Sequence, residues 1–140
     1  MNVTRFHAAN ADEQETTRLL FERRDRLVRS RTECVNRLRA LALRLDMELT
    51  SDLTSLKAMG SVERRIASFR PQGYAQSELL DEMRDTVIEV RRILVKVREL
   101  EKRLVPFVER LAPEFVRGFF EFAARHSRLR VGTTAAAPDA

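Results

Sequence analysis

The chain has 140 residues, of which 26 are Lys or Arg and 21 are Asp or Glu, giving a formal charge of +5. That length suits one domain with a buried core. With only 4 Gly, 4 Pro and 6% aromatic residues, the composition disfavours turn-rich β folds and predicts an all-α protein. The single cysteine excludes an internal disulfide and agrees with a cytoplasmic localisation. No apolar run approaches the ~20 residues of a membrane helix, and the N-terminus lacks a signal-peptide core.

The first helix is predicted over about residues 12–49, after a flexible N-terminus over residues 1–11. Asn10 and Glu13 have the spacing of a capping box. Apolar side chains recur along this segment at helical spacing and form one packing stripe. Its central rows contain Leu20, Leu27, Leu38, Cys34, Leu41 and Leu45, and Val28, Val35, Ala42 and Leu49 widen it.

A second helical segment is predicted over about residues 52–69. Apolar residues recur there at helical spacing, but Gly60 and Ser61 lie in the middle. One kinked helix and two short helices both fit this pattern. The run Arg70-Pro71-Gln72-Gly73 predicts a firm stop, because Pro disfavours helix before it and Gly favours a turn.

The third helix is predicted over about residues 77–105 and has the strongest pattern. Its apolar residues alternate at spacings of three and four, with one interruption at Glu101. Pro106 is expected to bend or end the helix. This apolar seam is the predicted self-association surface, and it consists of Leu80, Met83, Val87, Val90, Leu94, Val97 and Leu104.

A fourth helix is predicted over about residues 113–128, since Pro113 is acceptable at a first helical position and four of the eight Phe follow it. Residues 131–140 are predicted to be a disordered tail. The expected architecture is therefore an antiparallel long-helix bundle or coiled coil over residues 12–130, with a Phe-rich C-terminal helix. Its wide apolar stripes could be closed within the chain or by dimerisation.

The positive charge is concentrated between Arg18 and Arg44. Nine arginines and three acids lie there, a net charge of +6 against +5 for the whole chain. Such a helix could lay guanidinium groups along a phosphate backbone of DNA or RNA. It could equally be a solvated face, with Glu22 and Arg26 as an ordinary i,i+4 pair. The predicted nucleic-acid contacts are Arg23, Arg24, Arg26, Arg31, Arg37 and Arg44.

Arg24 and Arg31 interrupt the apolar face of the first helix. A buried unpaired guanidinium is costly, so three arrangements remain open for them. They could pair with acids of a partner helix such as Glu101 or Asp85, reach an anionic ligand, or lie where the seam opens to water.

The sequence contains no recognisable catalytic or metal-binding constellation. The two histidines, His7 and His126, lie at opposite ends, and the four glycines are isolated. Metal ligands, a phosphate loop and a cofactor site are therefore not expected. Cys34 falls on the apolar stripe, which predicts a buried, inert thiol. We expect no catalysis by this chain alone and no small-molecule substrate.

The segment Leu19–Leu41 resembles the middle segment of the insertion-sequence one-ten transposases, the DEDD, Piv-type recombinases guided by a bridge RNA. Members carry a run in the style of L-L-x-x-R-R-x-x-L-V-x-x-R-T-x-x-x-N-R-L-x-x-L. It falls here on Leu19, Leu20, Arg23, Arg24, Leu27, Val28, Arg31, Thr32, Asn36, Arg37, Leu38 and Leu41. The Arg- and Leu-rich segment from Ser77 to Leu104 fits the family's second long helix.

The resemblance covers about Val3 to Glu114 and implies a scaffold role. Family members place a RuvC-like nuclease domain before this segment and a domain with a nucleophilic Ser after it. Phe115 to Ala140 departs from that pattern, so no catalytic residue is carried over. The resemblance implies a helical segment that mediates homo-oligomeric assembly and contacts DNA or guide RNA during transposition.

Two other classes of protein remain as alternatives. A small helical enzyme of chorismate-mutase type would bind an anionic substrate with Arg24 and Arg31, and would need a third cation around a closed cavity. A plain helical adaptor would have a basic face without a nucleic-acid partner.

Overall fold

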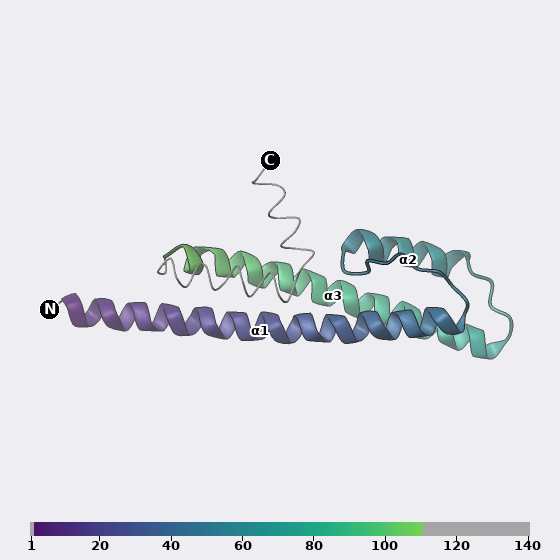
Figure 1. Ribbon diagram of the computed structural model, residues 1–140, viewed down its shortest axis with the longest axis horizontal. Helices are drawn as coiled ribbons and strands as arrows, with labels where there is room; N and C mark the ends of the chain where they lie inside the picture. Colours follow the sequence, from purple (N-terminus) through teal and green to yellow (C-terminus); the bar gives the residue numbers. More distant parts are fainter. Residues whose placement is uncertain (1, 111–140) are drawn as a thin grey trace. The chain divides into compact units, whose positions relative to one another are not determined.

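A computed structural model describes the backbone of residues 2–110 and the side chains of residues 11–110. It contains three helices, α1 (Asn2–Arg44), α2 (Leu56–Ser68) and α3 (Tyr74–Arg110). Helix α1 packs against α3, and α2 packs against α3, with no strand among residues 2–110 (Figure 1). The predicted all-α class is confirmed. The predicted fourth helix over 113–128 and the tail over 131–140 lie outside the described residues.

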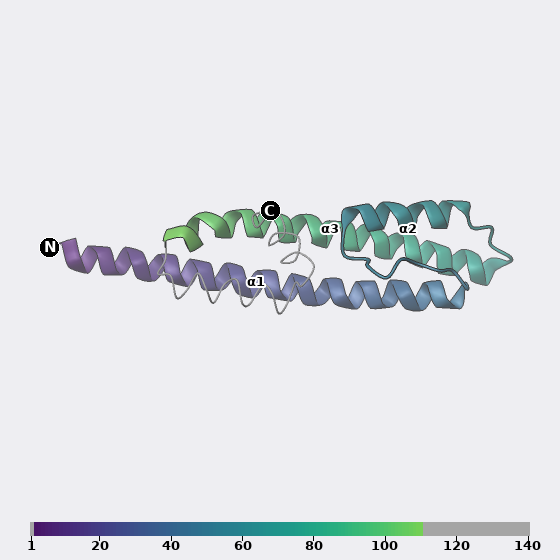
Figure 2. The same cartoon turned by 45° about the horizontal axis from the view of Figure 1, so that its top comes forward.

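The chain divides into two units, and α1 and α3 contribute to both. Unit 1 comprises, within the described range, residues 2–28 and 97–110. Its two helical stretches run antiparallel, since Glu13 pairs with Arg110 and Arg24 pairs with Glu101 (Figure 2). The core consists of Leu20, Leu100, Leu104 and Val108, with Phe21, Leu27 and Phe107 packed against it.

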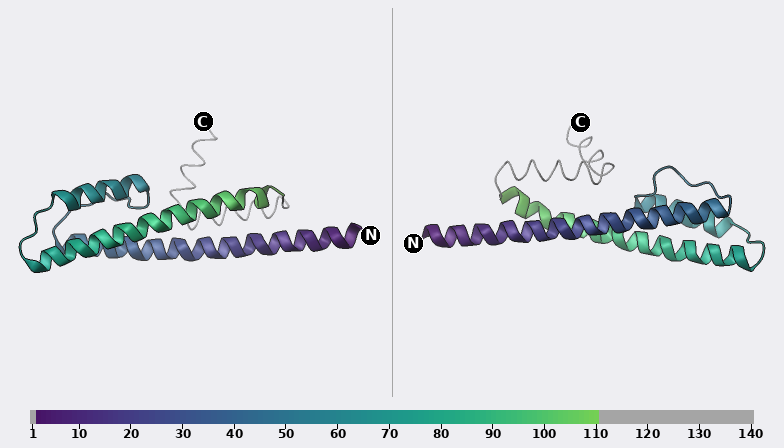
Figure 3. Two further views of the ribbon diagram at one scale, coloured as in Figure 1. Left: turned by 180° about the vertical axis from the view of Figure 1, so that it is seen from behind. Right: turned by 60° about the horizontal axis from the view of Figure 1, so that its bottom comes forward.

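Unit 2 comprises Arg29–Lys96 and contains α2 beside the first part of α3 (Figure 3). All three helices contribute buried residues, among them Leu38, Met59 and Met83 with no exposed surface. Arg39 holds the loop after α1 by donating hydrogen bonds to the carbonyl oxygens of Thr50 (3.3 Å) and Ser51. These bonds fix the connection that returns the chain to α2.

Helix α1 begins and ends earlier than the sequence predicts. It starts at Asn2, so residues 2–11, which the sequence places before the helix, belong to it. That stretch lacks Pro and Gly and is rich in Ala, a strong helix former, so nothing in it ends the helix. The helix stops at Arg44 because Asp46 adopts a left-handed conformation (φ 54°).

Two hydrogen bonds complete this C-terminal cap. The amide of Met47 donates to the carbonyl of Ala42 at 2.9 Å, and the amide of Asp46 donates to the carbonyl of Leu43 at 3.1 Å. This pair of bonds is the Schellman motif, and Met47 and Ala42, the positions that usually make its apolar contact, are both buried. The predicted end at residue 49 is therefore wrong, because Asp takes the position that Gly usually occupies.

Helix α2 is one short helix that begins four residues later than predicted. The hydroxyl oxygen of its N-cap, Ser55, accepts a hydrogen bond from the amide of Ala58 at 3.0 Å. Gly60 lies inside this single helix, which decides between the two open readings of the segment. The helix ends at Ser68, just before the predicted stop at Arg70-Pro71.

Helix α3 is longer than predicted at both ends. It starts at Tyr74, after Gly73 turns the chain with a positive φ of 94°. It also continues through Pro106 to Arg110, although an internal Pro removes a backbone hydrogen bond. Burial of Leu104 and Val108, on either side of Pro106, in the unit 1 core offsets that loss.

The seam predicted to mediate self-association is used within the chain. Leu80, Met83, Val87, Val90, Val97 and Leu104 are all buried, and only Leu94 is partly exposed. Helices α1 and α2 cover α3, so this surface is not available to a second copy of the folded chain. The prediction is wrong because the apolar stripes are wide enough to close a bundle inside one chain.

No helix in the described part of the chain is long and apolar enough to cross a lipid bilayer.

Candidate nucleic-acid interface

Arg24 is buried, which separates it from the other predicted nucleic-acid contacts. It has 0% relative exposure, and its Nε donates to Oε2 of Glu101 at 2.8 Å within unit 1. Of the arrangements open from the sequence, pairing with Glu101 is the one observed. A guanidinium without surface cannot reach a phosphate backbone, so the prediction that Arg24 contacts nucleic acid is wrong.

The Arg24–Glu101 pair joins the two interruptions in the apolar pattern. Arg24 breaks the stripe of α1, and Glu101 breaks the seam of α3. Arg24 is fully buried, whereas the Glu101 side chain keeps 13% of its exposure. Nη1 and Nη2 of Arg24 are buried and have no hydrogen-bond partner within residues 11–110. The pair fixes which turn of α1 faces which turn of α3, because any shift would leave a buried charge alone.

Several other arginines of α1 are held by neighbouring groups. Arg18 lies between Glu15 (2.6 Å) and Glu22 (2.5 Å) on the surface. The hydrogen bond with Arg18 lowers the pKa of the Glu15 carboxyl, and the same bond raises the pKa of Arg18. Arg37 lies near Glu89 of α3 at 3.7 Å. Because carboxylates partly neutralise Arg18 and Arg37, the positive charge on the surface of α1 is smaller than the count of its arginines suggests.

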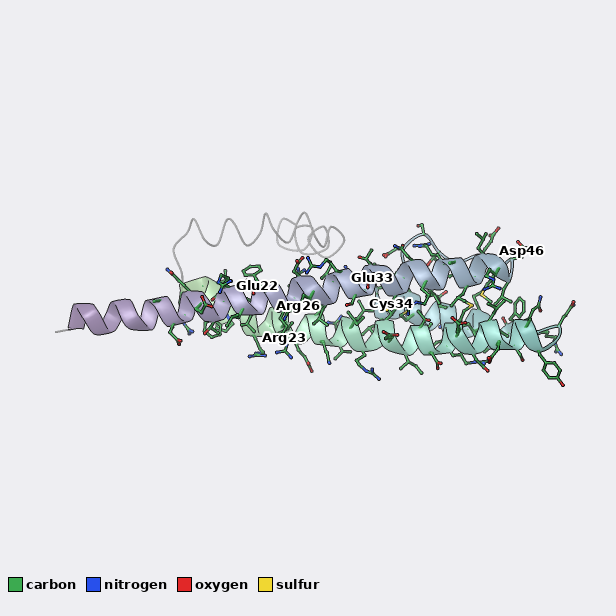
Figure 4. All side chains as sticks on the ribbon, turned by 90° about the horizontal axis from the view of Figure 1, so that it is seen from below. Glu22, Arg23, Arg26, Glu33, Cys34 and Asp46 are labelled. Atoms are coloured by element: carbon green, nitrogen blue, oxygen red, sulfur yellow. The ribbon has the colours of Figure 1, made fainter. Side chains whose placement is uncertain are left out.

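Arg23, Arg26 and Arg44 are the exposed arginines of α1 that form no ion pair within the described part of the chain. Arg23 and Arg26 project from the unit 1 stretch of the helix (Figure 4). Arg44 ends the helix in unit 2, where a cation also complements the negative end of the helix dipole. Arg31, the remaining predicted contact, is half-buried in unit 2.

Arg23 and Arg26 are closer together in sequence than any other two of the exposed, unpaired arginines among the described residues of α1. Side chains three residues apart on a helix are neighbours, so Arg23 and Arg26 present two guanidiniums together. Each guanidinium can donate two parallel hydrogen bonds to a phosphate. Glu22, next to Arg23 in sequence, is bound to Arg18, and Asp25, which lies between the two arginines in sequence, is half-buried. The arrangement can therefore bind a polyanion without first breaking an ion pair.

Arg24 is not free to bind the anionic substrate that the chorismate-mutase-type alternative requires. That alternative needed Arg24 to hold an anionic substrate, but a carboxylate of the same chain already neutralises that guanidinium. Within the described residues, no three His, Cys, Asp or Glu side chains form a metal site. Cys34 is buried as predicted, and burial raises the pKa of its thiol, which disfavours the reactive thiolate.

A basic cluster between α2 and α3 is absent from the sequence-based prediction. Arg91 of α3 forms two hydrogen bonds with Glu63 of α2, Nε to Oε2 at 3.1 Å and Nη2 to Oε1 at 2.6 Å. Arg64 of α2 and Arg91 both come within 4 Å of the position that a Cβ of Gly60 would occupy. The sequence gives one signal for this cluster, which is a glycine, Gly60, inside a helical pattern with Lys57 and Arg64 on either side of it.

No family model, curated protein or solved structure matches the chain.

Proposed function

We propose that the protein is a non-catalytic helical scaffold that binds the phosphate backbone of nucleic acid through exposed arginines of α1. The observation that carries this proposal is the pair Arg23 and Arg26, which is exposed and bound to no acid within the described residues. Ordinary solvated helix faces interleave acids and bases in i,i+4 pairs, as Arg18 does with Glu22. The sequence also offers Glu22 to Arg26 at this spacing, but Glu22 is bound to Arg18.

The resemblance of Leu19–Leu41 to the insertion-sequence one-ten transposases gives this binding a biological setting. We infer a role in DNA transposition or recombination, with DNA or a guide RNA as the partner. Homo-oligomeric assembly remains part of this proposal, but it must use a surface other than the α3 seam, which the chain itself buries. The helical adaptor is the alternative that binding measurements would favour if nucleic acid fails to bind.

Fluorescence anisotropy with a labelled DNA duplex at ~50 mM salt tests the proposal. We expect the double variant Arg23→Gln/Arg26→Gln to bind at least about tenfold more weakly than the wild type, since it loses two charge-assisted phosphate contacts. The matched control is Arg70→Gln/Arg92→Gln, which removes the same charge from exposed positions outside α1. Its affinity should stay within about twofold of the wild type.

Two results would contradict the proposal. Absence of binding by the wild type at this salt concentration would favour the adaptor. Equal weakening in both double variants would show that only net charge matters, and that the α1 arginines are not a site.

A further inference from the structure

Gly60 lies in the middle of α2 without a structural reason for being glycine. Glycine lowers helix stability relative to alanine, because it has more backbone freedom to lose. Its φ is not in the left-handed region, where only Gly73 is found among the described glycines. A Cβ at this position would meet only the ends of two flexible side chains, Arg64 Nη1 at 3.7 Å and Arg91 Nη2 at 3.9 Å. Both are ordinary contacts, so neither conformation nor packing requires Gly60.

Two guanidinium groups converge over this bare stretch of backbone. Arg64 reaches it from the next turn of α2, and Arg91 reaches it from α3. Both guanidinium nitrogens lie within 4 Å of the Gly60 Cβ position. The distance between Arg64 Nη1 and Arg91 Nη2 is therefore at most about 8 Å. Like charges this close repel one another, and Glu63, which pairs with Arg91, offsets only part of that repulsion. All of these residues belong to unit 2.

Glu63 orients this cluster without neutralising it. It holds Arg91 through two hydrogen bonds, so the Arg91 guanidinium has a fixed direction. Arg64 forms no ion pair within the described part of the chain, and Lys57, one turn earlier on α2, is exposed. Three cations and one acid therefore leave a surplus of two positive charges around Gly60.

We propose that Gly60, Arg64 and Arg91 form a binding site for a phosphoryl group. Glu63 occupies the Nε–Nη2 edge of Arg91, so the Nη1–Nη2 edge of Arg91 and the guanidinium of Arg64 remain to donate to the oxygen atoms of a phosphate. The missing side chain of Gly60 lets an oxygen approach the helix backbone. The surplus of positive charge matches a phosphate dianion or successive phosphodiesters. The ligand is a backbone phosphate of nucleic acid or a small phosphorylated compound. This site does not depend on the α1 arginines.

An NMR titration with inorganic phosphate at constant ionic strength tests the site. We expect saturable shifts of the Gly60 amide and of the Arg64 and Arg91 Nε–H signals. Arg64→Gln should weaken phosphate binding by about tenfold, the loss expected for a charge-assisted contact. Gly60→Ala should weaken it several-fold while raising the melting temperature, which separates loss of the site from loss of the fold.

The matched control is Arg65→Gln, an exposed cation of the same helix that should leave phosphate affinity unchanged. Shifts that never saturate, or equal losses in Arg64→Gln and Arg65→Gln, would overturn the site and identify only general ionic attraction. A Gly60→Ala variant with unchanged phosphate affinity would overturn the role of Gly60.

A short DNA duplex separates the two sources of phosphate. Shifts of the same signals at lower concentration than inorganic phosphate would identify a nucleic-acid backbone as the ligand. Saturation by phosphate with no response of these signals to the duplex would identify a small phosphorylated compound. The Arg23→Gln/Arg26→Gln variant should bind inorganic phosphate like the wild type, so this site and the α1 interface can fail separately.

Discussion

Removing either partner of the Arg24–Glu101 pair should destabilise the bundle by unequal amounts. Glu101→Leu leaves a guanidinium with 0% exposure and no counterion, whereas Arg24→Met leaves a carboxylate whose side chain is still 13% exposed. Breaking a buried ion pair from one side costs about 3–5 kcal/mol, and we expect Glu101→Leu to fall in that range. Arg24→Met should cost about 1–3 kcal/mol, because Glu101 can turn towards water.

The double variant Arg24→Met/Glu101→Leu should recover the loss. It makes the stripe of α1 and the seam of α3 continuous at this level, and apolar replacement of a buried ion pair is often neutral or stabilising by about 1–4 kcal/mol. Urea unfolding followed by circular dichroism at 222 nm gives the free energy of unfolding of all four proteins. The two single losses should therefore not add, and the double-mutant cycle should show a coupling of several kcal/mol.

Additive losses below about 0.5 kcal/mol in both single variants would refute this reasoning. They would mean that Arg24 reaches water in solution and does not fix the pairing of α1 with α3. A Glu101→Leu variant that is milder than Arg24→Met would refute the assignment of Arg24 as the more deeply buried partner.

Five further outcomes follow from local geometry. Asp46→Gly should stabilise the protein by about 0.5–1 kcal/mol in thermal unfolding, since Gly adopts the left-handed cap freely; no gain would count against the cap. Ser55→Ala should cost about 1 kcal/mol, and Ser55→Asp should recover most of it, as calorimetry can measure. Cys34 should react with a disulfide reagent only as fast as the protein unfolds, and fast labelling of the native protein would contradict its burial. Because burial raises the folded-state pKa of this thiol, its contribution to stability is complete below the ordinary pKa of cysteine and is lost as the pH rises through the raised value. For Glu15 the pKa is lowered, so the stabilisation from Arg18 is present above the ordinary glutamate pKa and disappears as the pH falls through the lowered value. In an NMR titration, Arg18→Gln should return the Glu15 midpoint towards its ordinary value, and an unchanged midpoint would exclude Arg18 as the cause.

Apolar periodicity predicted the helices because burial follows it directly. The residues of the α3 seam and the α1 stripe are buried almost throughout, and the two interruptions, Arg24 and Glu101, pair with each other. Periodicity did not show which surface would cover the seam. A stripe buried by its own chain and one buried by a second copy have the same sequence pattern.

Helix ends were predicted less well than helix cores. Asp46 in a left-handed conformation ends α1, and an internal Pro106 fails to end α3. Both outcomes depend on tertiary packing of Met47 and Val108, which local preferences do not include. Charge counting likewise located the basic helix, but it could not distinguish the buried Arg24 from the exposed Arg23, its neighbour in sequence.

The salt dependence of DNA binding tests the central claim most directly. Each phosphate contact adds about 0.9 to the slope of log K against log salt for duplex DNA. Arg23→Gln/Arg26→Gln should therefore have a slope shallower than that of the wild type by about 1.8, while Arg70→Gln/Arg92→Gln keeps the wild-type slope. Identical slopes for all three proteins, or wild-type binding indifferent to salt, would contradict phosphate recognition by the α1 arginines.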